Sequence, residues 1–137
     1  MNPAEFSLHD VAAFPLVRLT PERFAPGSAE CWTAEMNLLL ELATPFVLLV
    51  ENPAHGHTES HEDRKALILW AKRNKRTFSD VCKGIIGIDA DRTVHALRRI
   101  QVKILSAVFG VPVRLAADWE EAVRLAWTLL PERRDYE

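Results

Sequence analysis

Residues 46–50 constrain the fold of this chain more than any other segment. All five are apolar (FVLLV), and the polar sequence ENP follows at once. A strand with one face in water would alternate apolar and polar residues, whereas an unbroken apolar run is typical of a parallel strand that is covered on both faces. We therefore expect a central strand of a mostly parallel sheet here.

Three more segments are typical of strands. They are residues 13–19, 82–88 and 111–116. Pro15 lies in the first of them, and because proline has no backbone N–H to donate, we expect this strand at an edge of the sheet. The strand over residues 82–88 contains two glycines, which allow another segment to approach its backbone closely.

Apolar residues at helical spacing predict four helices that alternate with the strands. The first two cover residues 30–43 and 61–76, and the last begins at Asp118, which forms a capping-box pattern with Glu121 three residues later. Because strands and helices alternate throughout, the predicted fold class is α/β: a four-stranded, mostly parallel sheet with four helices.

The third helix is expected between the strand that ends at residue 88 and Gly110. Asp89 or Asp91 caps its start, and Gly110 closes its end. The residues at helical spacing that we expect on its inward side are Val94, Leu97, Gln101, Ile104, Leu105 and Val108. These side chains would then pack on the sheet.

The size and composition of the chain predict one domain. It has 137 residues, of which 48% are hydrophobic and 26% charged, the ordinary balance of a globular protein. We expect a single α/β domain over residues 13–131. An N-terminal arm of residues 1–12 precedes it, and a polar tail of residues 132–137 follows.

Several features predict a cytoplasmic protein that does not cross a membrane. No apolar stretch reaches the roughly 18 residues that a membrane span needs. The N-terminus carries Glu5 and Asp10 where a secretory signal would carry Lys or Arg. Cys31 and Cys82 have no C-x-x-C spacing, which suits buried thiols in a reducing compartment.

Charge is distributed unevenly along the chain. Residues 64–103 contain eleven Lys or Arg and three Asp, a net charge of +8, while the whole chain has a net charge of −2. This segment either steers an acidic partner or a phosphate-bearing ligand toward one face, or is the solvated side of two helices. We expect no nucleic-acid binding, because the pI is about 6.2 and no aromatic residues alternate with the basic ones.

The sequence order PFVLLVEN, ESHEDRKALILWAKRN, VCKGIIGID and VPVRLAADWEEAVRLAWTLL resembles the STAS-type domains, in particular the bacterial SpoIIAA-like group. The resemblance extends over residues 45–130, and its most telling piece is E-D-R-K-A-L-x-x-W-x-K (residues 62–72) followed by C-K-G-I. It implies a non-catalytic domain that binds a partner protein. In that family, phosphorylation of a serine at the start of the helix after the central strand releases the partner.

Two positions differ from that family's pattern. Ser60 is the residue nearest to the phosphorylated serine, but it lies in Glu59-Ser60-His61 and not in the family's Asp-Ser-Ser-Gly run. The family also opens with a strand hairpin, for which residues 6–8 would supply the missing strand. Regulation through Ser60 is therefore an open question.

The segment after the central strand, PAHGHTESHED, holds three of the five histidines of the chain. Ligands of open α/β sheets bind at the carboxyl ends of the strands, so this segment is the expected site. The residues expected to contact a ligand or partner are Asn52, His55, His57, Ser60 and Arg64. No cofactor is expected for such a binding site.

A metal site is the alternative for the same segment. Histidine nitrogen and carboxylate oxygen bind Zn and Fe, and the candidate ligands are His55, His57, His61 and Glu59. A small metal-dependent enzyme would use Glu59 or Glu62 as a ligand or general base. A cupin is excluded, because its His-x-His motif requires an all-β barrel.

A third possibility is a polar loop in which Ser60 caps the next helix, with Asp63 at the third helical position. His9 lies in the unperiodic arm and has no predicted role. The leading expectation is a STAS-like, non-catalytic binding or regulatory domain that contacts a protein or a small acidic ligand through this loop. A homodimer through an exposed strand edge, with the basic helices left for an acidic partner, is also possible.

Overall fold

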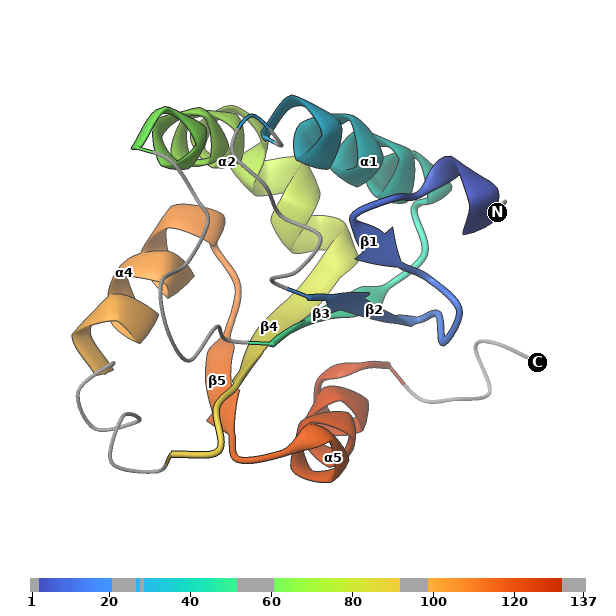
Figure 1. Ribbon diagram of the computed structural model, residues 1–137, viewed down its shortest axis with the longest axis vertical. Coiled ribbons are helices and arrows are strands. Elements are labelled where there is room, and N and C mark those ends of the chain that lie inside the picture. The colour runs from blue at the N-terminus through green and yellow to red at the C-terminus, as the bar shows by residue number, and fades with distance from the viewer. Residues whose placement is uncertain (1–2, 21–26, 28, 52–60, 92–98, 132–137) are drawn as a thin grey trace.

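The computed structural model describes residues 3–20, 27, 29–51, 61–91 and 99–131 (Figure 1). Over these residues the chain forms five strands, four α-helices and one 3-10 helix. In chain order they are η1 (Pro3–Glu5), β1 (His9–Asp10), β2 (Leu16–Leu19), α1 (Ala29–Leu42), β3 (Phe46–Glu51), α2 (His61–Val81), β4 (Cys82–Ile88), α4 (Arg99–Phe109), β5 (Val113–Ala116) and α5 (Trp119–Leu129). The expected α/β fold class is confirmed.

The sheet has the strand order β1-β2-β3-β4-β5. Only β1 and β2 are antiparallel, and β2 to β5 are parallel to one another, as expected. β3 lies in the middle, and its first four residues are buried. The predicted number of strands was wrong by one, because β1 has two residues, too few for a recognisable pattern. It lies just after residues 6–8, where the sequence suggested a further strand.

Pro15 does not mark an edge strand, because β2 lies between β1 and β3. β2 begins at Leu16, so the proline precedes the strand and its missing N–H breaks no ladder. The carbonyl of Pro15 still accepts a hydrogen bond from the N–H of Val47 at 3.0 Å. The edge prediction was therefore wrong because the strand is shorter than its apolar run.

The described helices cover the two faces of the sheet unequally. α1, α2 and α4 lie on one face and α5 on the other (Figure 1). The core under the first face joins the aromatic side chains Trp32, Trp70 and Phe78 to β2 and β3. The core under α5 is smaller and contains the small residues Ala122 and Ala126. The α5 face of the sheet is therefore covered by fewer of the described helices and by smaller side chains.

Three local signals in the sequence are confirmed. Gly84 faces α5, where a Cβ would lie 2.5 Å from Cδ1 of Leu129. Gly110 ends α4 with a φ of 73°, a conformation that favours glycine. Asp118 caps α5, since its Oδ1 accepts the N–H of Glu121 at 2.8 Å, while the carboxylate of Glu121 accepts the N–H of Ala117.

The inward side predicted for the third helix was wrong at Ile104 and Leu105, which are 57% and 41% exposed in α4. α4 contacts the core through its last turn, where Phe109 lies 5.3 Å from the ring of Phe78. Val108 also packs there, as expected. Val94, Leu97 and the side chain of Gln101 lie outside the described residues.

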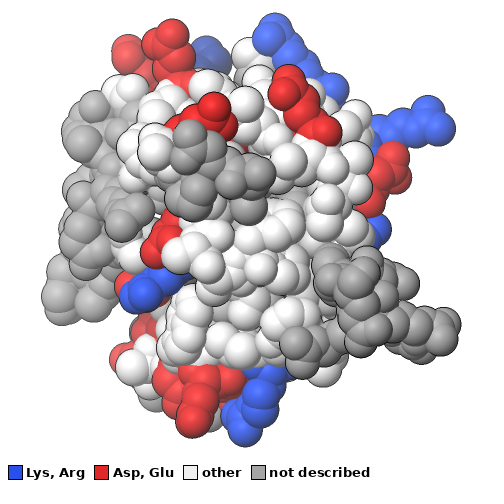
Figure 2. Space-filling model, turned by 90° about the vertical axis from the view of Figure 1, so that its right-hand side faces the viewer, with Lys and Arg blue, Asp and Glu red and all other residues white. Residues whose placement is uncertain are grey.

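The segment expected to be an N-terminal arm contributes to the core over the residues that are described. Leu8 and Val11 are buried against the α1 side of the sheet. Figure 2 faces the side on which β1 lies and shows charged side chains around an uncharged centre. β1 has two residues, so this edge of the sheet is too short to offer much backbone for another strand to pair with.

The remaining predictions on domain limits concern the C-terminus, and residues 132–137 lie outside the described part. Among the helices that the structure describes, none is long and apolar enough to cross a membrane.

The expectation that both cysteines are buried was half right. Cys82 is buried, whereas Cys31 is exposed, and both thiols are free.

Candidate functional site

The expected site lies largely outside the described residues. Asn52, His55, His57, Glu59 and Ser60 belong to that part, and of His61 and Arg64 only the helical backbone is described. Within the described ranges, no group of three or more His, Cys, Asp or Glu is arranged to hold a metal ion. The ligand, metal and phosphorylation predictions for this loop stay predictions.

The two ends of the loop are described, and they agree with the expected place. β3 ends at Glu51, at the carboxyl edge of the parallel strands, and α2 starts at His61. This is the edge at which open α/β sheets bind ligands. The residues beside Glu51 therefore indicate what a bound group would meet.

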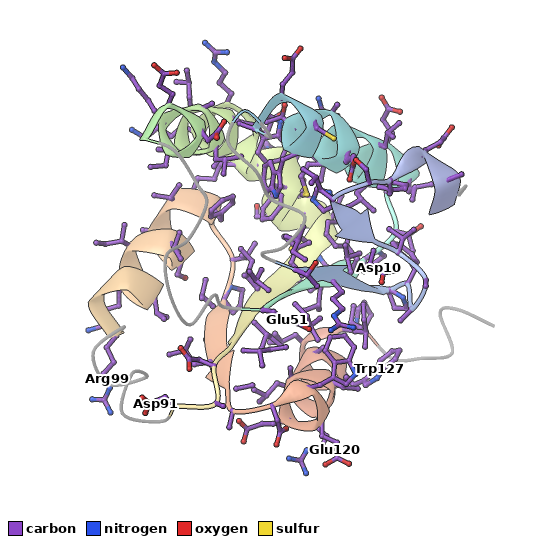
Figure 3. All side chains as sticks on the ribbon, viewed as in Figure 1. Asp10, Glu51, Asp91, Arg99, Glu120 and Trp127 are labelled. Carbon is purple, nitrogen blue, oxygen red and sulfur yellow. The ribbon has the colours of Figure 1, made fainter. Side chains whose placement is uncertain are left out.

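Arg18, Glu51 and Trp119 form a polar group at this edge, here called the Arg18 cluster. Nη2 of Arg18 forms an ion pair with Oε1 of Glu51. The guanidinium carbon lies 4.9 Å above the centre of the Trp119 ring, a cation–π contact. Glu51 is labelled in Figure 3, between β2 and α5.

The fold explains why these three residues meet. Arg18 pairs with Leu49 in the β2–β3 ladder, so Glu51 lies two residues further on the same face of the sheet. Trp119 is the first residue of α5, the helix that covers this face. Its position follows from the cap at Asp118.

The Arg18 cluster is partly open to solvent. The side chain of Arg18 is 42% exposed and that of Glu51 is 30% exposed. Nε of Arg18 is buried and has no hydrogen-bond partner in the described part of the chain. The cluster therefore presents a cation stacked on an aromatic ring, with donors beyond the one that faces Glu51.

A second polar group lies on the opposite face of the sheet. It consists of Ser7, His9, Cys31 and Glu35, and is called the Glu35 cluster below. The Glu35 carboxylate accepts the backbone N–H groups of Ser7 at 2.7 Å, Leu8 at 3.0 Å and His9 at 2.9 Å. It also contacts the Ser7 hydroxyl at 2.9 Å, Nδ1 of His9 at 2.8 Å and the Cys31 thiol at 3.2 Å.

Protonation in the Glu35 cluster follows from these contacts. Burial raises the pKa of Glu35, but the N–H of Ser7 and the hydrogen bonds of His9 outweigh it, so the pKa falls to about 2. Burial lowers the pKa of His9, and Glu35 only partly opposes this. An ionised Glu35 thus faces a neutral His9, whose Nδ1–H donates to the carboxylate.

The geometry of this cluster does not suit nucleophilic catalysis. The Ser7 hydroxyl donates to Glu35, so His9 is not placed to take its proton. The hydrogen bond from Ser7 lowers the pKa of the Cys31 thiol. Burial and Glu35 together raise this pKa by more than Ser7 lowers it, so the net shift is upward. The cluster instead attaches residues 7–9 to α1.

The sequence held one signal for this cluster. Glu35 lies three residues after Trp32 and four before Leu39, within the buried stripe of α1. A carboxylate on an apolar stripe requires a partner. Its partner His9 is 26 residues away and gives no pattern of its own, which is why no role was predicted for it.

Asp63, predicted only as the third helical residue after a cap, connects α2 to α1. Its carboxylate accepts the N–H of Gly27 at 2.8 Å and the N–H of Ala29 at 3.3 Å, and so binds the first turn of α2 to the start of α1. Ser60 as the cap of α2 stays a prediction.

Comparisons with protein-family models, curated proteins and solved structures gave no match for this chain.

Proposed function

We propose that this chain is a STAS-like, non-catalytic binding or regulatory domain that contacts a protein or a small acidic ligand at the carboxyl edge of its sheet. The observation that carries the proposal is the Arg18 cluster. It places a partly exposed guanidinium beside Glu51, the residue from which the predicted binding loop departs. Guanidinium groups match the shape of carboxylates and phosphates and bind them through paired hydrogen bonds.

The contact with Trp119 makes Arg18 suited to this role. A guanidinium held 4.9 Å above an aromatic ring loses less conformational freedom on binding than a free side chain does. An acidic group that reaches Arg18 would compete with Glu51. Binding would therefore move Glu51 or share the cation with it, and the loop that follows Glu51 would respond.

The Glu35 cluster supports a non-catalytic function. It is the most polar group in the described core, and its contacts attach the N-terminal segment to α1. The Ser7 hydroxyl and the Cys31 thiol there both donate to the Glu35 carboxylate, whose pKa of about 2 makes it a weak base. The family resemblance points the same way, because STAS-type domains act by binding.

The proposal is tested by thermal unfolding with inorganic phosphate, succinate, citrate and an Asp/Glu-rich peptide as probes. We expect at least one probe to raise the melting temperature, because a ligand at 100 times its Kd stabilises by about 2.7 kcal/mol. Arg18→Ala should abolish the increase. Arg124→Ala is the matched control, since Arg124 is an exposed arginine of α5 outside the cluster.

Three results would contradict the proposal. One is an equal response to the probe in Arg18→Ala and Arg124→Ala. Another is the absence of any response in the wild-type protein. The third is stoichiometric Zn or Fe in the purified protein together with turnover that His57→Ala abolishes, which would favour the metal-dependent enzyme.

A further inference from the structure

The outer surface of α1 and α2 has properties that ligand binding at Arg18 does not use. The two helices lie side by side on the sheet (Figure 1), and a groove of about 420 Å³ runs between them. Three small residues are among those that line it, Ala29 and Thr33 of α1 and Ala66 of α2. Small side chains allow another helix to approach closely.

Leu69 is the apolar centre of this surface. It lies in the groove, and 46% of the side chain is exposed, whereas the adjacent Trp70 is 8% exposed. Ile68 is also exposed (37%), but it is not among the residues that line the groove. Leu69 is the exposed large apolar side chain among the lining residues, and a single such residue at the centre of a contact can supply much of its binding energy.

Two charged residues line the groove, Glu30 on α1 and Arg73 on α2, and further exposed charges lie on the same two helices. Glu30 and Glu41 are the exposed charged residues on the outside of α1. On α2, Lys65, Arg73 and Arg76 are exposed at helical spacing around Leu69, and the acidic Glu62 is exposed in the first turn. The two ion pairs found in the described residues, His9 with Glu35 and Arg18 with Glu51, involve none of these six.

This arrangement is complementary to itself. A two-fold axis along the groove places α1 of each copy over α2 of the other, so each acidic stripe meets a basic one. Because residues 29–37 lie beside residues 66–74 across the groove, Glu30 comes near Lys65 of the other copy, and Glu41 near Arg76. A purely acidic partner would leave Glu30 and Glu41 without a basic residue to face, whereas a second copy supplies residues of both signs.

We infer that the α1–α2 surface is the contact surface of a homodimer, with Leu69 at its centre. This differs from the dimer through a strand edge, which would use β1 or β5 at the ends of the sheet. It also leaves the Arg18 cluster accessible, because α5 covers the opposite face (Figure 1). Dimerisation and ligand binding are therefore separable.

Light scattering and sedimentation equilibrium, from low micromolar to near-millimolar protein, test this inference. We expect a dimer whose dissociation constant rises with salt. Leu69→Asp should raise that constant at least about tenfold, as expected for a central contact. The control is Leu105→Asp on α4, since Leu105 is a similarly exposed leucine (41%) outside this surface, and we expect it to leave the constant within about threefold.

A charge exchange gives an independent test that does not depend on the apolar centre. Arg76→Glu should weaken the dimer, because it would face Glu41 of the other copy, and Arg76→Glu combined with Glu41→Arg should restore it. A monomer at every concentration overturns the inference. Equal effects of Leu69→Asp and Leu105→Asp, or no rescue by the double exchange, overturn it as well.

Discussion

Glu35 and Glu51 are two carboxylates paired with bases on opposite faces of the same part of the sheet. In the β1–β2 ladder His9 pairs with Leu19 and Asp10 with Arg18. Successive residues of a strand point to opposite faces, so His9 turns toward α1 and Arg18 toward α5. Neighbouring residue pairs of this ladder therefore contribute to different clusters: His9 belongs to the buried Glu35 cluster and Arg18 to the partly exposed Arg18 cluster.

The two faces give these carboxylates different roles. The side chain of Glu35 is 5% exposed and accepts three backbone N–H groups between α1 and the N-terminal segment. Glu51 is 30% exposed and contacts a guanidinium that is 42% exposed. A buried, fully hydrogen-bonded carboxylate stabilises the fold, whereas an exposed ion pair contributes little stability and can exchange partners.

The largest effect is expected from Glu35→Gln. The amide keeps the shape but removes the charge and turns a donor toward the backbone N–H groups. We expect a loss of about 2 to 4 kcal/mol in the free energy of unfolding, measured by urea denaturation. Glu120→Gln, at an exposed glutamate of α5, should stay within about 1 kcal/mol. Equal losses would show that Glu35 has no special part in stability.

The next largest effect is expected from acid: the free energy of unfolding should decrease as the pH falls. The pKa of Glu35 is about 2 in the fold against 4.5 ordinarily, so the unfolded chain takes up its proton first as pH falls. About 3 kcal/mol should be lost between pH 4.5 and 2. His9, with a pKa below its ordinary 6.5, should begin a smaller loss already below pH 6.5.

Urea midpoints measured at a series of pH values check this expectation. In Glu35→Gln the steep part below pH 4.5 should disappear, because the titrating carboxylate is gone. The smaller loss that begins below pH 6.5 should remain in that variant, since His9 is still buried. An unchanged profile in Glu35→Gln would assign acid unfolding to other carboxylates.

The smallest effect on stability is expected from Glu51→Gln, the same change on the other face. Exposed ion pairs contribute about 0 to 1 kcal/mol, and the unfolding free energy should change by no more than this. The affinity for an acidic probe should rise, since Arg18 loses its competing carboxylate. Titration calorimetry with the probe identified by thermal unfolding measures this, and a lower affinity would mean that Glu51 itself helps to bind the ligand.

Much of the fold was predictable from local patterns. Residues 82–88 form β4 as expected, the apolar run from residue 46 is the buried strand β3, and Asp118 caps α5. Each of these depends on residues adjacent in sequence or one helical turn apart. Two predictions that failed, the edge position of Pro15 and the inward side of α4, depend on which element packs beside which.

The candidate site divides in the same way. The carboxyl end of β3 was predictable as its location, because parallel strands all end at one edge. The Arg18 cluster was not, since Arg18 and Glu51 are 33 residues apart and meet through the register of β2 and β3. No periodicity within either strand encodes that register.

The sequence by itself determined the class of the fold, the central strand and the caps at Gly110 and Asp118, because apolar period and capping act over a few neighbouring residues. Only the tertiary structure decided that Glu35 is buried with His9 and that Arg18 lies on Trp119. The first contact depends on the pairing of β1 with β2 and on the helices that cover that face, and the second on α5 covering the opposite face of β2 and β3. Pairing and covering are set by the packing of the whole chain, which no short segment contains.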